Sequence, residues 1–327
     1  MSLESPELSP EVPGAAARAG GNAGRRLLYA AFTLTVLVGI LVAARGMPWR
    51  ETWRALTDAR PAWIAAAFLL NVAQLPLWAS QWRFLAPPGQ CPSWRRMFAI
   101  VSTVSLTQNV LPFIGGPITA AGLLVLRGGM TRGGAVSVIA LDQMLTGLGK
   151  LAALALAAAA TPMPAWLRDG TWSFTAVVAA MLFGLVILAR ATSWLDRRAA
   201  RHRLIAHLAD WTRHLSGLRR LGGPVWWGFF YALLKKTCEV LAALAIQRAC
   251  GIELGWSAAT LAVAALGLST LLRTPGNLGI YEATVVAIYG ALGVPAAPAL
   301  AAALLQHLMS LAPRFGAGSI ALALSRR

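Results

Sequence analysis

The chain has 327 residues, of which 57% are hydrophobic and only 13% are charged, and its mean hydropathy is +0.62. A soluble domain is about half apolar and about a quarter charged, so this composition excludes an ordinary soluble domain and favours helices that cross a membrane. The net charge of +17 would suit nucleic acid, but the basic residues mostly lie in short segments between apolar runs. We therefore expect contact with anionic membrane lipid and no nucleic-acid binding.

In chain order, residues 1–24 are rich in Pro, Glu, Ala and Gly and are predicted to form a disordered tail. Residues 25–327 are predicted to form a single membrane domain. Six apolar stretches in it are long enough to cross a bilayer. They are Leu27–Ala44, Ala62–Trp82, Gly134–Ala160, Trp172–Ala189, Val225–Ala249 and Ala296–Leu324. The first stretch, 27–44, is expected to be a retained anchor helix, since no convincing cleavage site follows it.

Two further apolar segments are interrupted in the middle by residues that break helices. The first, Phe98–Leu126, is broken around Asn109, Pro112, Gly115, Gly116 and Pro117. The second, Trp256–Gly293, is broken at Arg273, Pro275, Gly276, Asn277 and Gly279. Each half of these segments is too short to span a bilayer comfortably, so we predict two re-entrant helical hairpins. Backbone groups freed at such breaks must be satisfied by protein or water.

The two broken segments are predicted to belong to an internal repeat, with repeat 1 at 62–160, a linking helix at 172–189 and repeat 2 at 225–324. An offset of 164 residues separates Gly129 from Gly293. The same offset also pairs Ser93 with Ser257, Ser105 with Ser269, Gly115 with Gly279, Leu141 with Leu305, Thr146 with Ser310 and Lys150 with Arg314. Three crossings between the two units would invert the second unit relative to the first. This is the inverted-repeat pattern of transporters, in which paired broken segments mark the substrate site.

Loop charge predicts the orientation. The segment Arg190–Arg220 contains eight Arg, two Asp and no Lys, which places it in the cytoplasm. The bacterial inner membrane is the expected location, with both termini inside and the loop Arg45–Arg60 outside. Leu204, Leu208 and neighbouring apolar residues recur every three or four positions, so 190–222 is predicted as a basic amphipathic segment on the cytoplasmic leaflet. The alternative is that this segment only fixes the orientation of the protein in the membrane and has no further role.

All three Lys of the chain, Lys150, Lys235 and Lys236, lie inside predicted spans. Because a lone charge at the bilayer centre costs at least about 2.5 kcal/mol, each should face a partner or a wet cavity. Lys235 and Glu239 are spaced i, i+4 and are predicted to pair. The excess of cations indicates a cavity for an anionic headgroup such as a phosphate, with structural ion pairs as the alternative. The predicted substrate-binding residues are Asn109, Pro112, Gly115, Gly116, Asp142, Gln143, Lys150, Arg273, Pro275, Gly276, Asn277, Gly279, Glu282, His307 and Arg314.

No catalytic constellation, Gly-rich nucleotide loop or metal-ligand motif is found in the sequence. The three Cys have neither zinc-site nor redox-motif spacing. We therefore expect no cofactor, no metal and no enzymatic activity.

Several short motifs at the breaks are familiar. They are Gln81–Leu85, Asn109–Pro112 with Gly115 and Gly116, Leu126–Gly129 and Pro275–Glu282. Together they resemble the signatures of the flippase-like family named after the transmembrane region of lysylphosphatidylglycerol synthase. The resemblance covers roughly Ala55–Leu324. It implies paired re-entrant hairpins in inverted repeats, and translocation of aminoacylated phospholipids or of isoprenoid and glycolipid intermediates. After its first break this chain lacks the acid and the Arg that the family often has there.

The sequence therefore predicts an all-α polytopic membrane protein that moves an anionic, isoprenoid or glyco-lipid between leaflets. The residues show no soluble aminoacyl-transferring domain, so lipid synthesis is not expected. Two alternatives stay open. One is a membrane partner that holds a lipid for a lipid-biosynthesis transferase without transport, and the other is a secondary transporter of small solutes.

Overall fold

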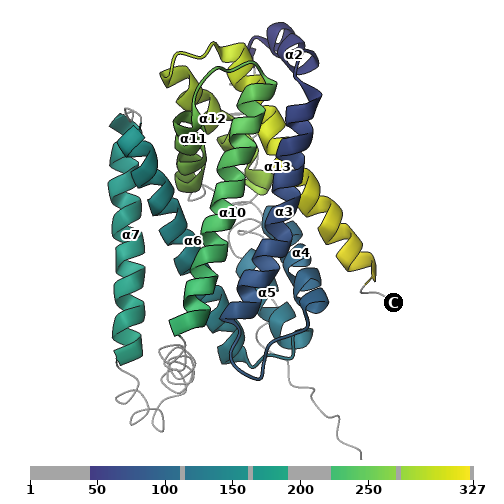
Figure 1. Cartoon of the computed structure of the whole chain (residues 1–327), viewed down its shortest axis with the longest axis vertical. Coiled ribbons are helices and arrows are strands. Elements are labelled where there is room, and N and C mark those ends of the chain that lie inside the picture. The colour runs from purple at the N-terminus through teal and green to yellow at the C-terminus, as the bar shows by residue number, and fades with distance from the viewer. Residues whose placement is uncertain (1–44, 111–114, 161–164, 191–221, 270–273, 325–327) are drawn as a thin grey trace, which may run out of the picture. The chain divides into compact units, whose positions relative to one another are not determined.

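The computed structural model describes residues 45–110, 115–160, 165–190, 222–269 and 274–324 (Figure 1). Contacts divide the chain into two units, Met1–Met47 and Pro48–Arg327, and every helix discussed below belongs to the second. The predicted tail, the predicted first helix at 27–44 and the basic segment at 191–221 lie outside the described residues.

Within the described residues the second unit is helical and contains no strand. Its elements are α2 (Trp49–Thr57), α3 (Pro61–Leu85), α4 (Trp94–Val110), α5 (Gly115–Leu126), α6 (Arg132–Ala160), α7 (Ala165–Arg190), α10 (Gly222–Ala249), α11 (Trp256–Ser269), the short 3-10 helix η1 (Pro275–Asn277), α12 (Ile280–Ala291) and α13 (Ala296–Leu324).

The long helices cover five of the six predicted spans, and α13 has the predicted bounds. Among the described helices, three are long and apolar enough to cross a membrane: α3, α6 and α13. This is fewer than the six predicted spans. Of the other three, the span at 27–44 lies outside the described residues, α7 is not among the helices found, and α10 carries Lys235, Lys236 and Glu239 in its middle. The protein is thus helical, with several segments suited to a membrane.

The segment predicted as an outer loop, Arg45–Arg60, contains the helix α2. Thr52 is buried, and its hydroxyl donates to the carbonyl oxygen of Pro48 at 3.0 Å, while Trp53 is exposed. The helix packs against α13. The prediction of a loop is therefore wrong for Trp49–Thr57, because a helix that is exposed on one side also tolerates the Arg residues of this segment.

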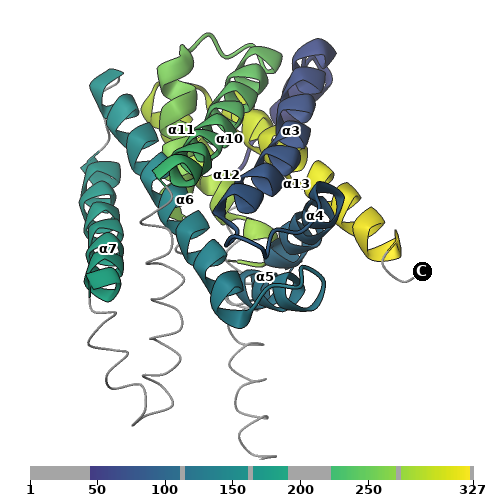
Figure 2. The same cartoon turned by 60° about the horizontal axis from the view of Figure 1, so that its bottom comes forward.

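The helix bounds repeat along the chain. α3 and α10 end 164 residues apart, α6 and α13 begin and end 164 residues apart, and α5 and α12 each have 12 residues. The packing is reciprocal as well. α6 packs against α11 of the other half, α13 packs against α4, and α3 lies along α10 (Figures 1 and 2). Each half is therefore completed by the last helix of the other.

Each half also has its own apolar core. The first is built on Trp82, Met97 and Leu145, and the second on Ile288 and Tyr289 surrounded by many Ala residues. Small residues let helix backbones approach closely, which is how helices associate where lipid removes the hydrophobic driving force. α7 lies at the edge of the bundle, next to α6 (Figures 1 and 2).

Both interrupted segments form pairs of short helices. α4 packs against α5, and α11 packs against α12. In the second pair the chain turns through Gly276, Asn277 and Gly279, whose φ angles are 63°, 55° and 80°. Positive φ is easy for Gly and tolerated by Asn, so the residues that predicted the break also give it its shape.

Candidate functional site

A polar cavity lies between the two halves of the bundle. It consists of two adjoining pockets of about 210 and 250 Å³. Six residues from five helices line both pockets: Asn71, Gln108, Thr146, Lys150, Glu239 and Arg314. Because α3, α4, α6, α10 and α13 all contribute, the cavity depends on how the two halves meet.

Four basic and two acidic side chains line the cavity. They are Lys150, Lys235, Lys236, Arg314, Asp142 and Glu239. The predicted pair of Lys235 with Glu239 is wrong. Lys235 Nζ lies 3.7 Å from Asp142 Oδ1 of α6, and Glu239 is bound by Lys236. Because Lys235 points toward α6, the next residue on α10, Lys236, pairs with Glu239 instead.

Lys235 and Asp142 form an ion pair that joins the two halves. Asp142 is almost fully buried, and Lys235 Nζ lies 5.4 Å from the centre of the Trp78 ring. An ammonium over an indole face is attracted by the ring quadrupole. Trp78 in turn packs edge to face on Trp82 with ring centroids 5.4 Å apart. These contacts fix the end of the cavity nearest α3.

Lys150 closes another side of the cavity. Its Nζ donates to the carbonyl oxygen of Gly267 at 3.2 Å. Gly267 lies in the last turn of α11, where carbonyl groups lack partners within the helix and carry partial negative charge. A Cβ atom at this position would lie 3.3 Å from the aliphatic stem of Lys150, so the absent side chain leaves room for the lysine.

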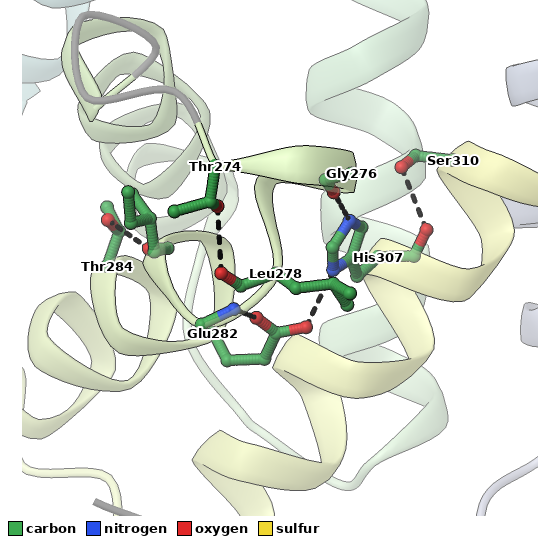
Figure 3. Close-up of polar contacts among 9 residues, drawn as sticks. Thr274, Gly276, Leu278, Glu282, Thr284, His307 and Ser310 are labelled. Atoms are coloured by element: carbon green, nitrogen blue, oxygen red, sulfur yellow. Dashed lines mark hydrogen bonds and ion pairs between the residues drawn. The ribbon is translucent and has the colours of Figure 1, made fainter. Parts of the chain in front are cut away.

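The second break lies beside the cavity and is held by hydrogen bonds (Figure 3). The Thr274 hydroxyl donates to Leu278 O at 2.9 Å. Glu282, in the first turn of α12, accepts the Gly279 N–H through Oε2 at 2.8 Å and contacts His307 Nδ1 through Oε1 at 2.6 Å. His307 Nε2 lies 2.8 Å from Gly276 O. One carboxylate and one imidazole thus connect the turn, α12 and α13.

A comparison with protein families matches residues 28–318 to the lysylphosphatidylglycerol synthase TM region. The chain belongs to this family. The resemblance predicted from the motifs is thereby confirmed, and it covers most of the chain. No curated protein and no solved structure matches. Membership of the lysylphosphatidylglycerol synthase TM region family identifies a membrane protein connected with lipid metabolism or translocation.

In this member of the lysylphosphatidylglycerol synthase TM region family, the predicted site residues fall into two groups. Those that line the cavity are Asp142, Gln143, Lys150, Asn277 and Arg314. Those that form the hydrogen-bonded turn beside it are Gly276, Gly279, Glu282 and His307, and the backbone of Pro275 opens η1. The predicted residues Pro112 and Arg273 lie outside the described residues.

The residues of the first break are placed differently. Asn109 is buried, and its Nδ2 donates to Ser105 O of its own helix at 2.7 Å, whereas the preceding Gln108 lines the cavity. Gly115 opens α5, and a Cβ atom on Gly116 would lie 2.8 Å from Gln108 Cβ. Gly116 therefore permits the close approach of α5 to α4 beside the cavity wall.

Several cavity residues were missing from the predicted site. They include Asn71, Gln74, Trp78, Gln108, Thr146, Lys235, Lys236, Glu239, Tyr281, Gln306 and Ser310. Asn71 and Gln74 could have been predicted from the sequence, because two amide side chains one turn apart are unusual in an apolar span. In the structure Gln74 donates to Asn71 at 3.0 Å. Lys235, Lys236 and Glu239 were recognised as charges within a span, but their common cavity follows only from the packing.

Proposed function

We propose that this protein moves a lipid between the leaflets of the bacterial inner membrane and holds its anionic headgroup in the cavity between the two halves. The observation that carries the proposal is an excess of basic over acidic side chains in a cavity surrounded by apolar helices. Arg and Lys bind phosphate through charge-assisted hydrogen bonds, which are strongest away from bulk water. Family membership supports a lipid as the ligand.

The proposal includes an inverted repeat with two re-entrant hairpins and both termini in the cytoplasm. It is supported by the 164-residue offset of helix bounds and by the reciprocal packing of α6 on α11 and of α13 on α4. In transporters built this way, one repeat rocks against the other around a site at their interface. The role is transport without catalysis, and enzymes of lipid biosynthesis are the candidate partners that supply or consume the lipid.

The test is translocation of labelled lipids in liposomes that contain the purified protein. Headgroups of equal size with and without a phosphate monoester separate charge recognition from simple scrambling. We expect Lys150→Gln and Arg314→Gln each to slow movement of the anionic lipid about tenfold or more, because a hydrogen bond to a charged group contributes about 1.5–3 kcal/mol. Arg54→Gln is the matched control, since Arg54 is exposed on α2 and is not among the residues that line the cavity.

Three outcomes contradict the proposal. Wild-type rates in both cavity variants would remove the cavity as the headgroup site. Tight co-purification of a lipid that never changes leaflet would identify a lipid-holding partner of a transferase. Transport of a soluble anion without movement of lipid would identify a small-solute transporter.

A further inference from the structure

The contacts of His307 fix where its protons lie. Its Nε2 is 2.8 Å from the carbonyl oxygen of Gly276, and a carbonyl oxygen only accepts, so Nε2 carries a hydrogen. In the neutral imidazole the other nitrogen, Nδ1, then carries no hydrogen and can only accept a hydrogen bond. It faces Glu282 Oε1 at 2.6 Å. A bare nitrogen and an ionised carboxylate would repel each other at this distance, so the contact requires one further proton between them.

This proton can sit on either partner without changing the pair's net charge. The pair is an imidazolium with a carboxylate, or a neutral imidazole with a carboxylic acid. Neither group can turn away freely. Rotation of Glu282 breaks the bond from the Gly279 N–H at 2.8 Å, and rotation of the His307 ring breaks the bond to Gly276. The turn Thr274–Gly279 is therefore clamped on two sides by a pair that binds one proton (Figure 3).

The clamped turn forms part of the cavity wall. Asn277, within the turn, lines the cavity, and so does Tyr281. The Tyr281 ring stacks on the His307 ring with centroids 4.3 Å apart and planes at 10°. A movement of the His307 ring therefore disrupts its stacking on Tyr281, and an opening of the turn displaces Asn277. The proton site and the cavity share these two residues as a common boundary.

Among the described residues, charged side chains of three helices line the adjoining cavity together with Tyr281: Glu239 of α10, Arg314 of α13 and Lys150 of α6. α11, which packs against α12, has no charged residue. On α2, α3 and α4 the charged side chains are exposed: Arg50, Glu51, Arg54, Arg83, Arg95 and Arg96. Within the described residues, the proton of this contact is therefore held between Glu282 and His307, and Glu239, Arg314 and Lys150 line the cavity beside it.

We propose that Glu282 and His307 form a proton-binding site, and that release of its proton opens the turn Thr274–Gly279 at the edge of the cavity. The proton leaves to water, and the pair, now one carboxylate and one neutral imidazole, separates. Because the closed turn binds one more proton than the open turn, closure is favoured at low pH and lost as pH rises. The coupling of this proton to lipid movement rests on the proposed function, whereas the proton site itself does not.

Hydrogen–deuterium exchange of residues 274–279 in nanodiscs tests the site without any lipid transport. After correction for the intrinsic pH dependence of exchange, we expect the wild-type turn to lose protection as pH rises. Glu282→Gln should abolish this loss, because its amide donates to Nδ1 and accepts from Gly279 at every pH. His307→Gln is a second non-titrating variant, and Glu51→Gln, exposed on α2, is the control that keeps the wild-type response. An unchanged pH response in Glu282→Gln and His307→Gln would overturn the proposal.

Liposome transport then separates this proposal from the proposed function. With both in place, lipid movement depends on pH in the wild type, and Glu282→Gln loses that dependence. If the wild type moves lipid and Glu282→Gln keeps the same pH profile, the coupling is wrong and the proposed function stands. If the wild type moves no lipid while its turn still opens with pH and Glu282→Gln does not, the proposed function is wrong and the proton site stands.

Discussion

The two halves of the bundle share one sequence of helices but hold their breaks in different ways. At the first break, the Asn109 side chain bonds within its own helix, donating to Ser105 O at 2.7 Å. At the second, Glu282 and His307 connect the turn to two helices through bonds of 2.6–2.8 Å. The residue 164 positions before His307 is Gln143, which is exposed and does not titrate.

The two halves therefore have similar helices but contribute different features to the bundle. The first half packs around large side chains such as Trp82 and Met97 and supplies cavity walls, including Lys150. The second half packs around Ala-rich helices and supplies the Glu282–His307 contact that holds its turn. The two halves match in the lengths of α5 and α12 and of α6 and α13, yet the bonds between helices are concentrated at one break. The substitutions below ask how independent the halves are.

The largest expected effect concerns the ion pair that joins the halves. Lys235→Met leaves Asp142 buried without its cation, and breaking a buried pair costs about 3–5 kcal/mol. We expect the free energy of unfolding to fall by an amount within this range, measured by SDS titration of the purified protein followed by circular dichroism.

The matched control is the double variant Lys235→Met with Asp142→Asn, which removes the uncompensated charge. It should recover most of the lost stability, because replacing both partners of a buried pair is often nearly neutral. Equal losses in the single and double variants would mean that Lys235 stabilises the bundle through its packing on Trp78 and not through the pair.

A smaller effect is expected where the halves cross. At the crossing of α13 and α4, a Cβ atom on Gly318 would lie 2.5 Å from Leu106 Cβ and 2.8 Å from the backbone oxygen of Ser102. Gly318→Ala should therefore lower the free energy of unfolding by about 1–3 kcal/mol through overpacking. At the reciprocal crossing, the atoms nearest to a Cβ on Gly267 belong to the flexible stem of Lys150, at 3.3 Å, so Gly267→Ala should cost less.

Gly316→Ala is the control for helix propensity, because a Cβ atom there meets nothing within 4 Å. It should be neutral or stabilise the protein by up to about 1 kcal/mol. Equal losses for Gly318→Ala and Gly267→Ala would show that the two crossings are equally rigid and would remove this difference between the halves.

Much of this architecture could be predicted from the sequence. Apolar runs gave the long helices, because a membrane span has a strong and simple pattern, and the bounds of α13 were predicted to the residue. Gly276, Asn277 and Gly279 predicted a break because positive φ needs such residues. The paired motifs at the breaks predicted the family, which is confirmed.

The partners of the charged residues could not be predicted in the same way. Glu282 and His307 are 25 residues apart and meet only when α12 packs on α13. Lys235 was assigned to Glu239 by spacing on one helix, although its partner lies on α6. Adjacent residues on a helix point in different directions, and here Gln108 lines the cavity whereas Asn109 does not. The local sequence pattern determines where a helix begins and ends, whereas the packing of the helices determines which of its side chains meet partners on other helices.

The smallest effect is expected within the second turn itself. Asn277 has a φ of 55°, in the left-handed region where a Cβ atom crowds the backbone. Asn tolerates this region better than Ala, so Asn277→Ala should lower the free energy of unfolding by about 1 kcal/mol. Asn277→Gly adopts the same φ without that penalty and should stay close to the wild type in the same SDS titration. If both variants lose equal stability, the Asn277 side chain contributes through its contacts at the cavity wall, and the shape of the turn is then set by Glu282 and His307 and not by local backbone preference.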